Sequence, residues 1–111
     1  MLFRSTDPAQ PYGAALPWPE SSGRPARSAG ATVVLRNGVP LVWFDRRSHH
    51  AVTFPAAEAD AGWADELMSM VKNGRARSIE VRKVNGEAVA PTSTWATVLR
   101  AAGFEIGRAH V

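Results

Sequence analysis

Two Asn-Gly dipeptides, each set between short apolar runs, constrain the fold of this chain more than any other feature of its sequence. They are Asn37-Gly38 and Asn85-Gly86. A type I′ turn needs a positive φ at both central residues, and Asn followed by Gly meets that need best. The flanking runs cover residues 31–36, 39–44, 78–84 and 87–90. The sequence therefore predicts two β-hairpins.

The remaining elements follow from turn and helix signals. A turn at 45–49 leads into the apolar residues 51–54, which extends the first hairpin into a three-stranded meander. Residues 60–73 carry apolar side chains at helical spacing, and Gly74 provides a stop. A second helix is capped by Thr92 or Ser93 and ends at Gly103. The predicted buried faces consist of Trp63, Leu67, Met70 and Val71, and of Trp95, Val98, Leu99 and Ala102.

This order of elements, β-β-β-α-β-β-α, predicts an α+β fold. We expect a small curled or barrel-like antiparallel sheet of about five strands with two helices. The predicted domain covers residues 30–104. Residues 1–29 are a Pro-rich lead-in, since five of the eight prolines lie between residues 5 and 30. Tyr12, Leu16 and Trp18 would anchor this lead-in as an extended strap on a neighbouring surface.

Length and composition exclude several classes of protein. A chain of 111 residues is enough for one domain. It has no cysteine, which excludes disulfides, thiol catalysis and cysteine-based metal sites. No Gly-Lys-Ser or Gly-Lys-Thr follows a glycine-rich loop, so the chain lacks the phosphate-binding loop that ATP hydrolysis would need. The net charge of +3 permits a nucleic-acid partner without requiring one.

Basic residues gather in two parts of the chain and are the candidate contacts for nucleic-acid phosphate. They are Arg46 and Arg47 in the predicted turn, and Arg75, Arg77, Arg82 and Lys83 around the second hairpin. Such side chains can hold a phosphate backbone without reading its sequence. The alternative interpretation is an ordinary solvated turn and a charged strand edge that discourages aggregation.

Three other patterns were weighed for chemistry. The string Asp45-Arg-Arg-Ser-His-His50 contains the residue types of a hydrolytic triad, but neighbours in one turn point in different directions. Trp43 alternates with Phe44, so one ring should face outward, where it would stack on a base or pack against a neighbouring domain. Glu80 and Glu87 would serve acid–base chemistry only if they shared a pocket.

Several strings resemble one protein family. Residues 7–19 read DPAQPYGAALPWP, which resembles the segment that enters the final domain of the large helicase-related (Lhr) family of bacterial helicases. Later strings fit that family in the same order: Gly30-Ala31, Val33-Val34-Leu35, Asn37-Gly38, Leu41-Val42, Asn73-Gly74-Arg75, and residues 81–87 and 99–104. The resemblance covers about residues 5–104.

The resemblance implies a C-terminal accessory domain of an ATP-dependent 3′ to 5′ DNA helicase that takes part in DNA repair in the bacterial cytoplasm. The partners it implies are DNA or RNA–DNA hybrid, winged-helix domains of the same parent chain, and further copies of the protein. ATP and Mg²⁺ belong to the motor domains of such helicases. Their motifs match no position here, so the resemblance places no catalytic residue, cofactor or metal ligand in this chain.

Two alternatives remain open. The chain is part of a winged-helix DNA glycosylase-like module, or it is a purely structural or oligomerisation domain with an apolar patch around Tyr12, Leu16 and Trp18.

Residues 105–111, Glu-Ile-Gly-Arg-Ala-His-Val, match one reading frame of a common sequencing adapter. We expect this tail to be non-native.

Overall fold

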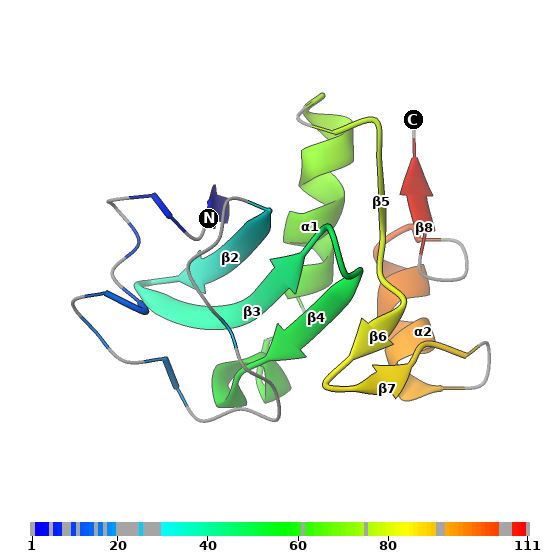
Figure 1. Cartoon of the computed structure of the whole chain (residues 1–111). Helices are drawn as coiled ribbons and strands as arrows, with labels where there is room; N and C mark the ends of the chain where they lie inside the picture. The colour runs from blue at the N-terminus through cyan, green and yellow to red at the C-terminus, as the bar shows by residue number, and fades with distance from the viewer. Residues whose placement is uncertain are drawn as a thin grey trace.

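The computed structural model describes most of the chain from residue 30 onward and parts of the segment before it. The described residues are 2–4, 6–7, 10, 12–14, 16, 18–19, 25, 30–60, 62–74, 76–90, 93–104 and 108–110. They form an α+β structure with two α-helices and an open, mixed six-stranded sheet (Figure 1). The predicted α+β class is confirmed, and the sheet does not close into a barrel.

The sheet has the strand order β1-β2-β3-β4-β6-β7. Its strands are β1 (Leu2–Arg4), β2 (Ala31–Arg36), β3 (Val39–Asp45), β4 (His50–Thr53), β6 (Lys83–Val84) and β7 (Glu87–Ala88). A 3-10 turn η1 (Pro55–Glu58) and helix α1 (Trp63–Lys72) follow β4, and helix α2 (Thr94–Ala101) follows β7. A separate two-stranded sheet pairs β5 (Ser78–Glu80) with β8 (Arg108–His110). The expectation that residues 105–111 are non-native stays a prediction.

The expected all-antiparallel sheet is wrong at one pairing, because β4 and β6 run parallel. The chain between these two strands passes through η1, α1 and β5 and then enters β6 in the direction of β4. Parallel neighbours require such a crossover, usually a helix, whereas a hairpin produces antiparallel neighbours. The predicted strand over residues 78–84 is therefore two strands, and only β6 belongs to the main sheet.

Both Asn-Gly turns have the predicted geometry. The φ angles are 53° and 79° at Asn37 and Gly38, and 54° and 85° at Asn85 and Gly86. Each turn has two central residues, since Arg36 pairs with Val39 and Val84 pairs with Glu87. The positive φ values at both positions confirm the two type I′ hairpins.

Helix α2 begins and ends as its sequence predicts. The Ser93 hydroxyl oxygen accepts a hydrogen bond from the Ala96 N–H at 3.1 Å, which makes Ser93 the N-cap. At the other end, the Gly103 N–H donates to the Arg100 carbonyl at 3.0 Å and the Phe104 N–H donates to the Leu99 carbonyl at 3.0 Å. This pair of bonds is a Schellman stop, and the buried Phe104 returns to the core.

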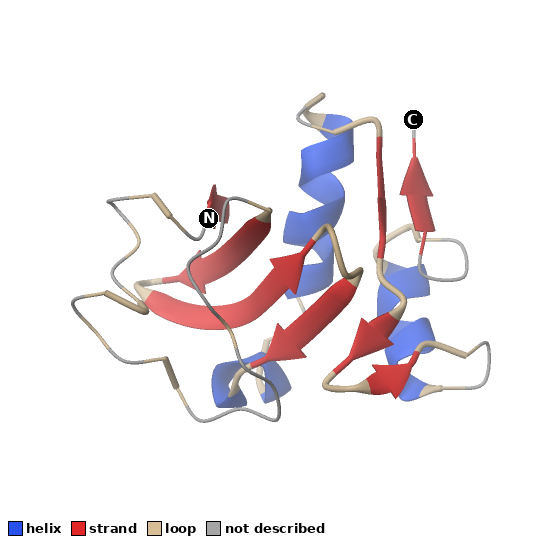
Figure 2. Cartoon of the chain, in the orientation of Figure 1, coloured by secondary structure: helices blue, strands red, loops and turns tan. Residues whose placement is uncertain are grey.

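The two faces of the sheet bury different layers. On one face, residues such as Val34, Val42 and Phe44 pack in a single cluster with the apolar residues of both helices. Figure 2 shows both helices behind the strands. Trp63 of α1 and Trp95 of α2 meet edge to face, with ring centroids 6.4 Å apart. The helices thus supply the core predicted from their apolar spacing.

The N-terminal strap covers the opposite face. Trp18 stacks on Phe54 with ring centroids 5.9 Å apart and an interplanar angle of 5°, and Tyr12 stacks on Trp18 at 6.1 Å. The Tyr12 hydroxyl also donates a hydrogen bond to the Gly38 carbonyl at 2.9 Å. Tyr12 and Trp18 are therefore anchors, as expected, whereas Leu16 is 45% exposed. The strand β1 at the sheet edge was not predicted.

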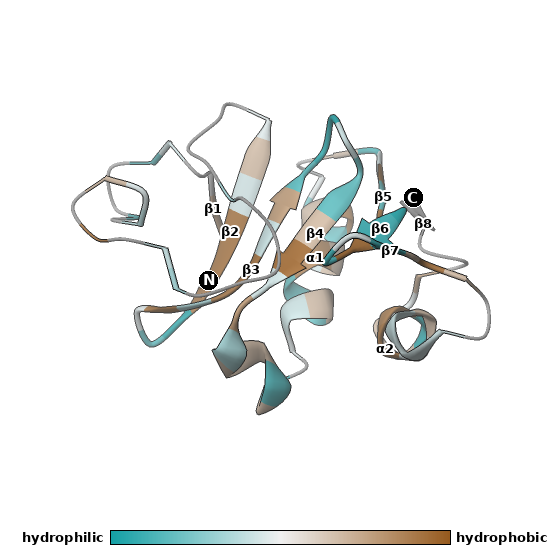
Figure 3. Cartoon of the chain, turned by 60° about the horizontal axis from the view of Figure 1, so that its bottom comes forward, coloured by the Kyte–Doolittle hydropathy of each residue, from teal (hydrophilic) through white to brown (hydrophobic). Residues whose placement is uncertain are grey.

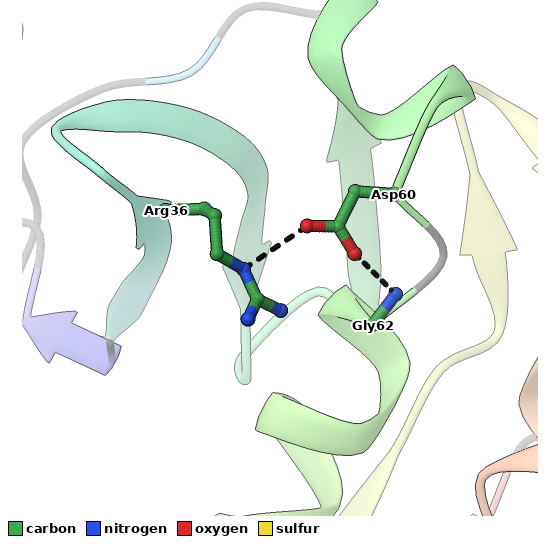
Figure 4. A network of polar contacts seen from close by, with 3 residues as sticks. All are labelled: Arg36, Asp60 and Gly62. Carbon is green, nitrogen blue, oxygen red and sulfur yellow. Dashed lines mark hydrogen bonds and ion pairs between the residues drawn. The ribbon is translucent and has the colours of Figure 1, made fainter.

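A polar contact fixes the end of β2 to the start of α1 (Figure 4). Arg36 Nε lies 3.0 Å from Asp60 Oδ2, and Asp60 Oδ1 accepts a hydrogen bond from the Gly62 N–H at 2.9 Å. A Cβ atom at residue 62 would lie only 2.7 Å from Arg36 Nη2. Glycine at this position therefore permits the close approach of the guanidinium group.

Candidate nucleic-acid interface

The turn between β3 and β4 presents Arg46 and Arg47 to solvent. Asp45 holds this turn: Oδ1 accepts a hydrogen bond from the Arg47 N–H at 3.0 Å, and Oδ2 accepts one from the Ser48 hydroxyl at 3.2 Å. The Gly30 carbonyl accepts a further bond from the Arg46 N–H at 3.0 Å. The backbone of the turn is thus fixed, while both arginine side chains are exposed.

Gly30 also sets the position of the Arg47 side chain. A Cβ atom at residue 30 would lie 3.1 Å from Arg47 Nε and 3.2 Å from its Cδ and Cγ atoms. The aliphatic part of Arg47 therefore runs along the bare backbone of Gly30. This contact gives a physical role to a glycine that the sequence alone did not single out.

The end of the turn is bonded to the second hairpin. The His49 carbonyl accepts hydrogen bonds from the Arg82 N–H at 2.8 Å and the Lys83 N–H at 3.2 Å. Lys83 is the register partner of His50 in the parallel β4–β6 pair. Neighbouring strands lie about 4.8 Å apart. Two basic pairs that are far apart in sequence thus belong to backbone segments that lie at the same end of β4.

Both histidines contribute to this junction. His49 Nδ1 lies 3.2 Å from the Glu80 carbonyl oxygen, and His50 Nε2 accepts a hydrogen bond from the Gly86 N–H at 3.0 Å. His49 therefore contacts the end of β5, and His50 contacts the turn of the β6–β7 hairpin. Sequence reasoning assigned them to a solvated turn and missed this role.

We call Arg46, Arg47, Arg82 and Lys83 the basic group. All four side chains are exposed. In Figure 3 the β3–β4 turn and β6 are hydrophilic, whereas the central parts of β2 and β3 are hydrophobic. The carboxylates of Asp45 and Glu80 lie beside the group. Asp45 accepts hydrogen bonds within the turn, and Glu80 Oε1 lies 3.2 Å from Arg82 Nε in an ion pair.

The Arg82–Glu80 pair leaves Arg82 available to a ligand. The Arg82 side chain remains 61% exposed. Exposed ion pairs contribute about 0–1 kcal/mol, because water screens them and two long side chains must be ordered. A phosphate oxygen can therefore replace the carboxylate at little cost.

The other two predicted contacts are not part of this group. Arg77 is exposed just before β5, and Arg82 lies beyond the other end of that strand. Five residues of extended chain span about 16 Å, so the two arginines are far apart along β5. Arg75 lies outside the described residues. The six predicted contacts remain predictions, and the structure brings four of them together.

Trp43 does not face outward, which corrects the expectation for it. It is 7% exposed and clusters with Val33, Val52 and Phe54 under the strap. Phe44 is buried on the helix side. Alternation would place one ring outside only if one face of the sheet were open. Here the strap covers the second face, so Trp43 is a core residue of this chain.

The other chemical patterns are not assembled into sites. Ser48 donates to Asp45, while His49 contacts the Glu80 backbone, so these side chains do not form a relay of the triad type. Glu87 is exposed on β7 and Glu80 is engaged with Arg82. Among the described residues, no three His, Asp or Glu side chains are close enough to hold a metal ion. Neither described helix has the length and apolar character to cross a membrane.

Asn85 fastens the second hairpin to β4 through its side chain. Its Oδ1 accepts a hydrogen bond from the Thr53 N–H at 2.9 Å, and its Nδ2 donates to Thr53 Oγ1 at 2.7 Å. Asn37 occupies the equivalent turn position with nearly the same φ, but its side chain is exposed. The two asparagines therefore form a matched pair for separating turn geometry from side-chain bonding.

We expect Asn85→Gly to lower the free energy of unfolding by about 1–3 kcal/mol, since two hydrogen bonds of about 0.5–1.5 kcal/mol each are lost. Glycine tolerates the positive φ at both turns, so Asn37→Gly should change the stability by less than about 0.5 kcal/mol. Urea denaturation followed by circular dichroism measures both. Equal losses in the two variants would show that the Thr53 bonds add no stability.

The sequence of this chain is similar to a part of a much longer protein. No family model matches the chain. A protein of Mycolicibacterium smegmatis named "Lhr helicase/ probable uracil glycosylase" is 45% identical over 93 residues, which cover 80% of this chain and 6% of that protein. The chain is thus similar to a short part of an Lhr helicase, and the match is consistent with a fragment or single domain of such a protein.

Proposed function

We propose that this chain is a C-terminal accessory domain of an Lhr-type, ATP-dependent 3′ to 5′ DNA helicase, and that it contacts nucleic acid for the motor. In this proposal its substrate is DNA or RNA–DNA hybrid, it packs on winged-helix domains of the same parent chain, and the parent acts in DNA repair in the bacterial cytoplasm. The similarity to the Mycolicibacterium protein supports an Lhr helicase as the parent protein.

The observation that carries the proposal is the junction of the β3–β4 turn with β6. It brings four exposed cations from two separate segments to one end of the sheet. A group of cations on a fixed backbone attracts a phosphate backbone through charge and through the release of its counterions. The neighbouring carboxylates do not cancel this charge, because there are two of them against four cations.

ATP and Mg²⁺ would be bound by other domains of the parent. This chain has no Gly-Lys-Ser or Gly-Lys-Thr motif. Its described residues also gather no set of carboxylates suited to a metal. The proposed role of this chain is to hold or guide a strand.

The assembly alternative has little support in the strap. It requires an apolar patch around Tyr12, Leu16 and Trp18, but Tyr12 and Trp18 are stacked in a column on Phe54. Leu16 and Val39 are the large apolar side chains that are exposed among the described residues. Two exposed side chains do not by themselves make the large contiguous apolar patch that marks an interaction surface.

The test is binding of the purified chain to labelled single-stranded DNA at about 50 mM and about 200 mM salt, with circular dichroism to confirm folding. Four phosphate contacts to a single strand give a slope of log K against log salt of about −2.8, so this fourfold rise should weaken binding about 50-fold. Folded protein that binds at neither salt concentration would contradict the proposal and favour a packing or assembly domain.

A further inference from the structure

We propose that the basic group contacts only the sugar–phosphate backbone and that no base stacks on this domain. The inference deepens the proposed function and rests on it: the ligand class is the polyanionic backbone itself, independent of base identity. The observation behind it is where the structure places the aromatic rings relative to the basic group.

No aromatic ring is fully exposed to solvent. All nine aromatic side chains of the chain lie within the described residues, and none is exposed. The buried rings are Trp43, Phe44, Phe54, Trp63 and Phe104, and the half-buried ones are Phe3, Tyr12, Trp18 and Trp95. Proteins that hold single strands by stacking need an aromatic face open to solvent.

Three of the four half-buried rings are also far from the basic group or already paired, and the fourth, Phe3, packs against the cluster under the strap. Tyr12 is bonded to Gly38 at the β2–β3 turn, while Arg46 and Arg47 follow the opposite end of β3. A strand of seven residues spans about 23 Å, which separates the two places. Trp18 stacks between Tyr12 and Phe54, and Trp95 packs against Trp63 in the helix layer.

The polar side chains beside the basic group are committed to the protein. Asn85 uses its carbonyl oxygen and its amide nitrogen on Thr53, and Ser48 donates to Asp45. One ring nitrogen of His49 contacts the Glu80 carbonyl in β5, and one of His50 accepts from Gly86 in the second hairpin. Asparagine and serine are among the side chains that read base edges. Their engagement leaves the four cations as the charged donors described at this surface.

An abasic backbone separates this inference from the proposed function. Binding of the chain is measured with oligothymidylate and with an abasic sugar–phosphate strand of equal length, at about 50 mM salt. We expect the two affinities to agree within about twofold, because stacking strengthens binding about fivefold or more per base when it occurs. Loss of affinity for the abasic strand alone would overturn the inference and leave the proposed function intact. Failure to bind either strand would overturn both.

A second variant tests the same point through the protein. Arg46→Lys with Arg47→Lys keeps the charge but removes the planar group that can pair with guanine or stack on a base. Contact through phosphate predicts an affinity within about twofold of the unchanged chain on both guanine-rich and thymine-rich strands. A selective loss on the guanine-rich strand would show that these arginines read bases.

Discussion

Trp43→Ala is expected to lower the free energy of unfolding by about 3–5 kcal/mol, as truncation of a large buried aromatic ring does. Trp43 lies opposite Val33 and Val52 in neighbouring strands, with Phe54 and the strap in the same cluster. The truncation leaves a cavity between the sheet and the strap. Because small domains have only about 5–15 kcal/mol of stability, this is a large share of the total. Urea denaturation followed by circular dichroism measures the loss.

The conservative variant Trp43→Phe separates a core role from a stacking role. It keeps an aromatic ring under the strap, so it should remain folded with a smaller loss of stability. Its affinity for single-stranded DNA should stay within about twofold, since a buried ring does not meet the ligand. A folded Trp43→Phe protein with strongly reduced DNA affinity would show that this ring contacts the nucleic acid.

Neutralising the basic group is expected to have the largest effect on binding. Each phosphate contact on a single strand adds about 0.7 to the magnitude of the salt slope, which is about fivefold in affinity at 0.1 M salt. Replacing Arg46, Arg47, Arg82 and Lys83 by alanine should thus weaken binding about 600-fold and remove most of the salt dependence. All four side chains are exposed, so the thermal midpoint should change little.

The chain offers a matched control for half of this change. Arg82→Ala with Lys83→Ala should weaken binding about 25-fold at 0.1 M salt. Lys72→Ala with Arg100→Ala removes the same residue types from exposed sites at the ends of α1 and α2. This second pair should change affinity by less than about twofold at that salt concentration. Equal losses in the two double variants would mean that net charge, rather than the basic group, determines binding.

The local elements of this fold could be predicted because their signals are local. Asn-Gly fixes a type I′ turn, and the Ser93 cap and the stop at Gly103 act within a few residues of themselves. The strand β1 has only three residues and no alternation of its own. Its pairing with β2 depends on contacts some 30 positions away, which no local pattern specifies.

The candidate site could likewise be predicted only where its signals are local in sequence. Its cations could be recognised in the sequence as two basic clusters. The two clusters lie at one end of the sheet because β4 pairs with β6 in parallel. The predicted antiparallel sheet does not contain this pairing. The misplacement of Trp43 has a related cause: alternation tells which residues share a face, but only the position of the strap shows that both faces are covered. The contacts of Gly30, His49 and His50 are distant in sequence, and no local pattern specifies them. Asn85 is recognisable as a turn residue, but its bonds to Thr53 are not predictable from the local sequence.

The most direct test of the basic group as the contact site is a titration of the isotope-labelled chain with a short oligothymidylate, followed by nuclear magnetic resonance of the backbone amides. The account predicts shifts centred on residues 45–50 and 80–87, where the β3–β4 turn meets the second hairpin. Shifts centred instead on the aromatic strap around Tyr12 and Trp18, or on the helices, would contradict it.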